Sequence, residues 1–266
     1  MSRFALGVEY DGTAFMGWQR QSHAGRTVQA CLEEALTTVA AHSVEVTCAG
    51  RTDAGVHASG QVVHFDTDAV RELRSWLLGV NSNLPDDVAV TWVKPVTPDF
   101  HARFQAQARH YRYSILNRTT RPALDREQVT WTHRPLDHES MQSAAQYLLG
   151  KHDFSAFRAV ECQARSPVRT LHRLRVTRQG ELIHIDVVAD GFLHHMVRNI
   201  AGVLMAIGAE KQPVEWARQV LAGRDRRLGG ITAPPQGLCF KAVLYAPRFD
   251  IPLPADSMFD GLSVTL

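Results

Sequence analysis

The chain has 266 residues, of which 45% are hydrophobic and 21% are charged, an ordinary composition for one large globular domain or two smaller ones. This composition argues against bulk disorder, and no apolar stretch approaches the ~20 residues that would span a bilayer. The N-terminal residues turn polar too soon for a signal peptide, so we expect a cytoplasmic protein. The formal net charge of +2 does not by itself indicate a nucleic-acid partner.

The cysteine pattern also indicates a reducing compartment. The chain has four cysteines, which are far apart in the sequence and form no CxxC pair: Cys31, Cys48, Cys162 and Cys239. This spacing is typical of buried or free thiols and not of a disulfide framework or a zinc site.

The first half of the chain predicts the order strand, helix, strand, strand, helix, strand. A strand is expected at 3–10, and a helix at 28–39 with Thr27 as its N-cap. Strands at 44–49 and 61–65 flank a glycine-containing loop, and a strand at 88–93 ends the half. The helix before that last strand is expected to bury Val70, Leu73, Leu77 and Val80.

The second half predicts a similar order. The expected elements are a strand at 109–116, a helix capped by Asp137 with Met141, Ala144, Ala145 and Leu148 on its apolar face, strands at 168–177 and 182–188, helices at 192–207 and 214–221, and a closing strand at 238–244. The β-α-β-β-α-β order is that of a ferredoxin-like, or split βαβ, unit. We therefore expect an α+β protein with two such halves, 1–106 and 107–248, a cleft between their sheets and a tail at 249–266.

The segment GRTDAGVHA, residues 50–58, lies between two expected strands. Glycines near both ends allow backbone shapes that other residues avoid, and let the chain approach a ligand closely. The loop combines the carboxylate of Asp53 with the guanidinium of Arg51 and the imidazole of His57. A short R-x-D-x-G string alone favours an Asx turn, in which Asp53 bonds its own backbone. The full string is much more specific.

GRTDAGVHA closely resembles the catalytic loop of the tRNA pseudouridine synthase A family. Other segments resemble that family in the same order: YDGT at 10–13 with GWQ at 17–19, FHARF at 100–104, RHYRY at 109–113, and GFLHHMVRNI at 191–200. GLCF at 237–240 fits as well, with Cys239 where an aromatic residue is more usual. The resemblance extends from about residue 3 to residue 245.

This resemblance implies a pseudouridine synthase fold of two ferredoxin-like halves with a central cleft. It also implies a homodimer that isomerises uridine in the anticodon stem-loop of tRNAs, at tRNA positions 38 to 40, with neither a metal nor an organic cofactor. The family's catalytic aspartate falls on Asp53. The active-site arginine falls on Arg198, and a tyrosine that packs on the target base falls on Tyr111.

The chemistry of the reaction suits these residue types. Pseudouridine forms when the bond between ribose C1′ and uracil N1 breaks, the base turns, and C1′ joins C5. No redox change occurs and no atom is lost, so neither a metal nor a cofactor is required. Asp53 could attack C1′ or C6, or remove the ribose 2′ proton, and these routes stay open. A nearby arginine would favour the charged carboxylate.

The substrate is expected to be held by residues outside this loop as well. Arg198 lies opposite the apolar stripe of its helix, and we expect it to pair with Asp53, although it could instead face water or contact phosphate. Tyr111 is expected to support the extruded base, whereas Tyr113 fits a cross-strand pair in the sheet. Arg51 is a further substrate contact. Leu238 forms an apolar wall against uracil or packs in the core.

Arginines are concentrated in two segments, five at 100–124 with no acidic residue and six at 156–178 with only Glu161. On charge alone a solvated strand face is the better interpretation. Within the second segment, Arg158 and Arg165 are expected to bind phosphates. The turn at Trp18, Gln19 and Arg20 could insert into RNA or be an ordinary exposed loop tip.

A metal site at His194 and His195 is not expected, because adjacent helical residues point ~100° apart and no third ligand is suitably spaced. Two other functions were compared with the isomerase. A non-catalytic RNA-binding module would have no use for GRTDAGVHA, and its RNP1 string is absent. A hydrolase that pairs Asp53 with His57 would need a second carboxylate or a metal to supply its nucleophilic water.

Overall fold

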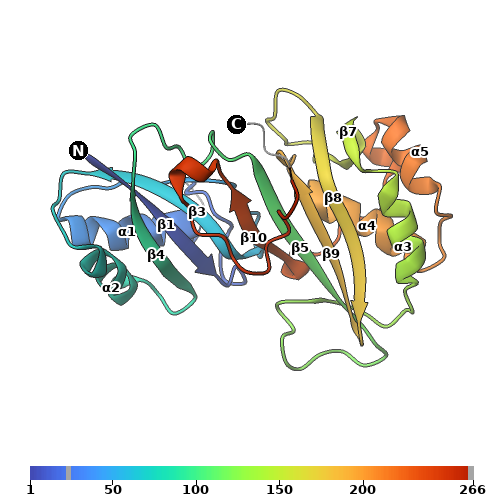
Figure 1. The fold of residues 1–266 in the computed structure, drawn as a ribbon. Helices are drawn as coiled ribbons and strands as arrows, with labels where there is room; N and C mark the ends of the chain where they lie inside the picture. The colour runs from blue at the N-terminus through green and yellow to red at the C-terminus, as the bar shows by residue number, and fades with distance from the viewer. Residues whose placement is uncertain (22–24, 263–266) are drawn as a thin grey trace. The chain divides into compact units, whose positions relative to one another are not determined.

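The computed structural model describes residues 1–21 and 25–262, and the chain divides into two compact units. The first comprises Met1–Arg109 with Phe240–Leu266, and the second comprises His110–Cys239. Both combine strands with helices, so the expected α+β class is confirmed (Figure 1). None of the helices in the described residues has the length and hydrophobicity needed to span a membrane.

The first unit contains the sheet β4-β1-β3-β10, with α1 and α2 next to each other beside these strands (Figure 1). Its elements are β1 (Ser2–Tyr10), α1 (Val28–Ala40), β2 (Thr47–Cys48), β3 (His57–Thr67), α2 (Leu73–Asn83), β4 (Val88–Val96) and the larger part of β10 (Leu238–Leu244). Strand β1 pairs antiparallel with both β3 and β4. The Thr27 side chain accepts a hydrogen bond from the backbone N–H of Ala30, which confirms it as the N-cap of α1.

The buried face of α2 differs from the expected one. Val70 precedes the helix and is 90% exposed, and Leu73 is exposed as well. Val80 is fully buried as expected, and Trp76, which was not expected on this face, is fully buried as well. The Trp76 indole lies 5.3 Å from the ring of Phe65, edge to face. A large aromatic side chain buries more apolar area than an aliphatic one, so Trp76 determines which side of the helix faces the core.

The second unit contains the strand order β5-β9-β8-β7, and α3, α4 and α5 group against one face of these strands (Figure 1). Its elements are β5 (Ala108–Asn117, from His110), β6 (Thr130–Thr132), α3 (His138–Gln146), β7 (Gly150–Asp153), β8 (Val168–Gln179), β9 (Leu182–Ala189), α4 (Met196–Gly208) and α5 (Trp216–Gly223), with short 3-10 turns at Ser155–Phe157, Arg226–Leu228 and Pro235–Gly237. The short strands β6 and β7 were not expected from the sequence. The expected closing strand of this half, β10, groups from Phe240 onward with the first unit.

The helix expected at 192–207 begins at Met196 and not at Phe192. His195 has a φ of 60°, which lies in the left-handed region, so the helix cannot extend through it toward its N-terminus. The expected stripe of Met196, Ile200, Val203 and Ile207 is buried. Asn199, Ala201 and Leu204 are buried too, so α4 is a core helix enclosed on more than one side.

His64 on β3 anchors the loop that follows β4. Its buried ring accepts a hydrogen bond at Nδ1 from the backbone N–H of Ala102, over 3.2 Å. Burial, together with the nearby His101 and Arg3, lowers the pKa of His64 to about 4, although Asp66 acts in the opposite direction.

A titration of stability should report this lowered pKa. The unfolded chain binds a proton at His64 near pH 6.5, and the folded chain does so only near pH 4. We therefore predict that this residue lowers the free energy of unfolding as the pH falls from about 6.5 to 4, by at most about 1.4 kcal/mol per pH unit. His64→Asn should reduce that slope in urea unfolding curves. An unchanged slope in the variant would contradict the assignment.

Candidate active site

The loop between β2 and β3 is fixed at its start by two polar side chains. The fully buried Gln61 side chain accepts from the backbone N–H of Gly50 (3.3 Å) and donates to its carbonyl (2.6 Å). One residue earlier, the Ala49 carbonyl accepts from Nε and Nη2 of Arg109, over 3.3 and 3.2 Å. A buried carbonyl that accepts from a guanidinium is held more strongly than one in a neutral hydrogen bond. These hydrogen bonds therefore fix the backbone that leads to Asp53 against the sheet.

The segment after β1 supports the same loop from its other side. The Thr52 carbonyl accepts from the backbone N–H of Trp18 (3.0 Å), and the Thr52 hydroxyl bonds the Tyr10 hydroxyl (2.8 Å). Gly17 has a φ of 91°, and a Cβ there would lie 2.8 Å from the Thr52 carbonyl oxygen and 3.1 Å from the Asp53 carbonyl carbon. Only glycine permits both this conformation and this approach. The segments YDGT and GWQ, which resemble those of the family, thus pack beneath the GRTDAGVHA loop and support it.

Trp18 is part of this support and is not an RNA wedge. Its side chain is only 2% exposed and packs 6.0 Å from the Tyr10 ring. Arg20 forms an ion pair with Glu33 at 2.9 Å. The expectation that Trp18 reaches into RNA is wrong, because the turn at Gly17 directs the indole into the core. Gln19 and Arg20 remain exposed.

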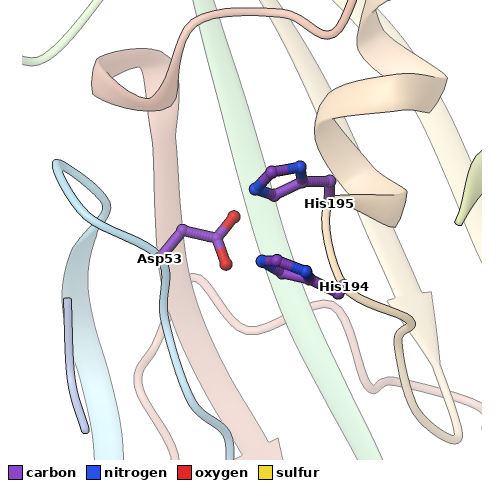
Figure 2. Close-up of side chains that lie close together, drawn as sticks. All are labelled: Asp53, His194 and His195. Atoms are coloured by element: carbon purple, nitrogen blue, oxygen red, sulfur yellow. The ribbon is translucent and has the colours of Figure 1, made fainter. Parts of the chain in front are cut away.

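The Asp53 side chain projects from this supported loop, half-buried, between the exposed Arg51 and Ala54 (Figure 2). An Asx turn would need the backbone N–H groups that follow Asp53. The N–H of Gly55 instead donates to the Phe15 carbonyl (3.3 Å), and that of Val56 donates to the Asp53 backbone carbonyl (3.2 Å). The two N–H groups that an Asx turn at Asp53 would use therefore have other acceptors in this loop.

His57 has a structural position. It is buried as the first residue of β3, and its Nδ1 accepts from the backbone N–H of Gly12 over 3.0 Å. An Asp11 carboxylate oxygen lies 3.1 Å from the same nitrogen. The ring therefore holds the turn after β1 in place, which favours a supporting role over an acid–base pair with Asp53.

The two tyrosines of β5 have different surroundings. Tyr111 is buried, and its ring meets that of Phe192 edge to face at 5.1 Å. The Tyr113 hydroxyl bonds the Thr130 hydroxyl (2.6 Å) and donates to the Pro234 carbonyl (2.9 Å). Burial raises the pKa of Tyr113, although Arg198 acts in the opposite direction. Tyr113 is thus a core residue through its hydrogen bonds and not through a cross-strand tyrosine pair.

The segment before α4 positions His194 and His195. Because these residues precede the helix, the expectation that their rings diverge by ~100° is wrong. Their ring centroids lie 4.0 Å apart with the planes tilted by 41°. Figure 2 shows the two rings next to each other. The backbone N–H of His194 donates to Sγ of Cys162 (3.4 Å), and its carbonyl accepts from Ala159 (3.0 Å).

Arg198 lies in the first turn of α4 and is half-buried. Its Nε donates to the Ala233 carbonyl (2.8 Å), and its own carbonyl accepts from the backbone N–H of Ala233 (3.1 Å). These two hydrogen bonds hold α4 against the segment that precedes β10. The expected pairing of Arg198 with Asp53 stays a prediction.

Three further residues that were expected to contact the substrate or its RNA also lie in the second unit. Leu238 is buried at the start of β10. Arg158 is half-buried and donates from Nη2 to the Cys162 carbonyl, so part of its guanidinium stabilises its own loop. Arg165 is exposed. Of the two, Arg165 is the better placed to meet an RNA phosphate.

Three structural roles were not found from the sequence. Gln61 and Arg109 hold the Asp53 loop, and Asp186 forms a buried cluster with His110 and Arg112. The Asp186 carboxylate lies 2.8 Å from both His110 Nε2 and Arg112 Nε. Hydrogen bonds from these two residues outweigh burial and hold the pKa of Asp186 below its usual value. In the sequence, the structural roles of Gln61 and Asp186 are indicated only by the presence of a polar residue inside an expected strand.

Comparison with known proteins decides the family. A family model described as tRNA pseudouridine synthase matches residues 7–105 and 144–246. The chain belongs to the tRNA pseudouridine synthase family. It is an isomerase that converts uridine to pseudouridine in tRNA.

Individual relatives agree with this assignment. Proteins named tRNA pseudouridine synthase A are 59% identical in Alcanivorax borkumensis (95% of this chain, 94% of the relative) and 57% identical in Pseudomonas aeruginosa (95% and 88%). A solved H/ACA RNP bound to a substrate RNA containing 2′-deoxyuridine matches with 11% identity and a TM-score of 0.32, covering 76% of this chain and 44% of that one. A match that weak does not establish a shared fold.

The contact at Gly17 can be tested by substitution. We predict that Gly17→Ala destabilises the protein by at least about 2 kcal/mol and lowers kcat for pseudouridine formation, because the Cβ would displace the Asp53 backbone. Gly180→Ala is the matched control, since Gly180 also has positive φ (60°) but its Cβ would meet nothing within 4 Å. The control should lose only about 1 kcal/mol and keep its kcat. Equal kcat values for the two variants would contradict the role of Gly17.

Proposed function

We propose that Asp53 is the carboxylate that reacts with the target uridine in the anticodon stem-loop of tRNAs. The observation that supports this is the way its loop is built. The Trp18 N–H bonds the Thr52 carbonyl, the Gln61 side chain bonds Gly50, and the glycine at position 17 lets the chain pass close to this backbone. The half-buried Asp53 side chain projects from the loop that these contacts fix. A carboxylate held in one place loses little entropy when it meets the substrate.

Asp53 can act in three ways that all balance without a redox partner. It can add to C1′ as the bond to N1 breaks, add to C6 of the uracil, or remove the ribose 2′ proton. In each case the base turns and C5 bonds to C1′. The bond from Asp53 to C1′ or C6 then breaks, or the 2′ proton returns to the ribose, and the C5 proton is transferred to a base or solvent while N1 regains one. The overall isomerisation consumes nothing else, which supports the proposal that neither metal nor cofactor takes part.

The remaining site residues are proposed to hold the nucleoside and its RNA. The base must leave its stack to be reached, so it needs an aromatic and apolar surface, for which we propose Tyr111 and Leu238. Arg198 is proposed to favour the ionised form of Asp53. Arg51, Arg158 and Arg165 would neutralise phosphates. Tyr113 is not proposed for this role, because its hydroxyl is already used in the core.

Family resemblance supports three further proposals. The modified uridines are those at tRNA positions 38 to 40, the enzyme works as a homodimer, and it acts in the cytoplasm. Each rests on the resemblance of the motifs at 50–58, 109–113 and 191–200.

Removing the charge at position 53 tests the catalytic proposal. Asp53→Asn should lower the single-turnover rate of pseudouridine formation by at least about 1000-fold, because the variant lacks the reactive carboxylate. Its Kd for tRNA should stay within about twofold of wild type, since the amide is nearly isosteric. Asp68→Asn, which changes an exposed carboxylate of the same unit, should react at the wild-type rate. A wild-type rate for Asp53→Asn would refute the proposal.

Salt dependence tests the arginine contacts. The slope of log Kd against log salt measures how many phosphates are neutralised. We predict that Arg165→Ala weakens binding to all tRNAs alike and lowers this slope by about 1, with a smaller effect for Arg158→Ala. Arg74→Ala, on the exposed side of α2, should leave the slope unchanged. A wild-type slope for Arg165→Ala would remove it from the RNA contacts.

A further inference from the structure

Two aromatic rings of the loop after β4 stack in a column on a third ring from β3. His64, in the sheet, lies 4.7 Å from His101 between ring centroids, and His101 stacks on Phe104 at 4.3 Å with the planes 29° apart. The column runs from a buried ring to an exposed one. Phe104 at its outer end is 76% exposed.

The turn that carries Phe104 is held in one conformation. Nδ1 of His101 accepts from the backbone N–H groups of both Arg103 and Phe104, each over 3.2 Å. The His101 carbonyl accepts from the backbone N–H of Gln105 (3.0 Å). Burial and the nearby Arg3 and Arg103 lower the pKa of His101. Phe104 is therefore an ordered exposed ring and not the tip of a loosely held loop.

A positive charge lies next to this ring. The Arg103 guanidinium carbon lies 5.7 Å from the Phe104 centroid. Burial raises the pKa of the Cys48 thiol to about 12, and the positive charges of Arg51 and Arg103 oppose this rise. Both guanidinium groups therefore lie close enough to Cys48, just before the Asp53 loop, to affect it. The neighbouring carboxylate of Asp99 is 3.3 Å from Arg248 and is compensated by it.

The turn is also connected to the Asp53 loop. Arg109 donates from Nη2 to the Arg103 carbonyl (2.7 Å) and from Nη1 to the Ala106 carbonyl (3.1 Å). The same guanidinium donates to Ala49, which directly precedes the loop. One side chain therefore sets the position of Phe104 relative to the backbone that leads to Asp53.

We propose that Phe104 is a stacking site for an unpaired nucleobase of the tRNA, with Arg103 binding a phosphate beside that base. This inference rests on the proposed function, since it places a second contact near the Asp53 loop. Single exposed apolar side chains are common and need no explanation by themselves. A flat, ordered ring extended from an aromatic column and flanked by guanidinium groups is instead typical of single-stranded RNA contacts, where each stacked base adds substantially to affinity.

Binding of tRNA to full-length variants tests this site. All variants carry Asp53→Asn so that no turnover occurs, and Kd is measured with unmodified tRNA by filter binding. Phe104→Ala should raise Kd by about 5- to 100-fold, the range expected for one lost base stack. Phe104→Trp should stay within about threefold of the parent, because it keeps a stacking surface. Val70→Ala is the matched control, being another highly exposed apolar residue of the same unit.

The possible outcomes separate this proposal from its alternatives. An unchanged Kd for Phe104→Ala, or equal losses for the alanine and tryptophan variants, would overturn it. Sedimentation of the same samples detects a second copy of the chain as the occupant, since Phe104→Ala would then change the oligomeric state, which also overturns it. Because Kd does not depend on turnover, failure of the Asp53 proposal would leave this result standing. The exposed ring should be removable without unfolding, as circular dichroism would verify.

Discussion

The structure around the candidate catalytic loop depends on a close backbone contact at Gly17. A Cβ at this position would come within 2.8 Å of the Thr52 carbonyl, so the chain can pass there only as glycine. Gln61 and Arg109 hold the start of the loop, where they bond Gly50 and Ala49. The loop is thus held by backbone groups and buried polar side chains.

This division of roles explains how a small set of residues can serve the isomerisation. In the proposed reaction a carboxylate is needed in a fixed place, and the contacts to the peptide on either side of residue 53 fix the backbone that carries it. His57 illustrates the same principle, since its ring bonds the Gly12 backbone and strengthens the turn below the loop. Arg109 extends the support to the turn that presents Phe104.

Local sequence patterns predicted the α+β class, the strands β1, β5, β8 and β9, and the candidate loop between two strands. They failed where tertiary packing decides. Trp76, and not the expected Leu73, occupies the buried face of α2, because an indole fills more of the core. The late start of α4 depends on the left-handed conformation of His195, which a non-glycine residue rarely adopts and no pattern indicates. The partners of Arg109 are distant in sequence, so only the fold brings them together.

The most direct test of the account is a map of pseudouridine in total tRNA from cells with and without the protein. We expect anticodon-arm pseudouridines to disappear without it and to return when the wild-type chain is supplied. Pseudouridines elsewhere in tRNA should be unchanged. Loss confined to another arm, or recovery of the anticodon-arm sites by a chain that lacks the Asp53 carboxylate, would contradict the account.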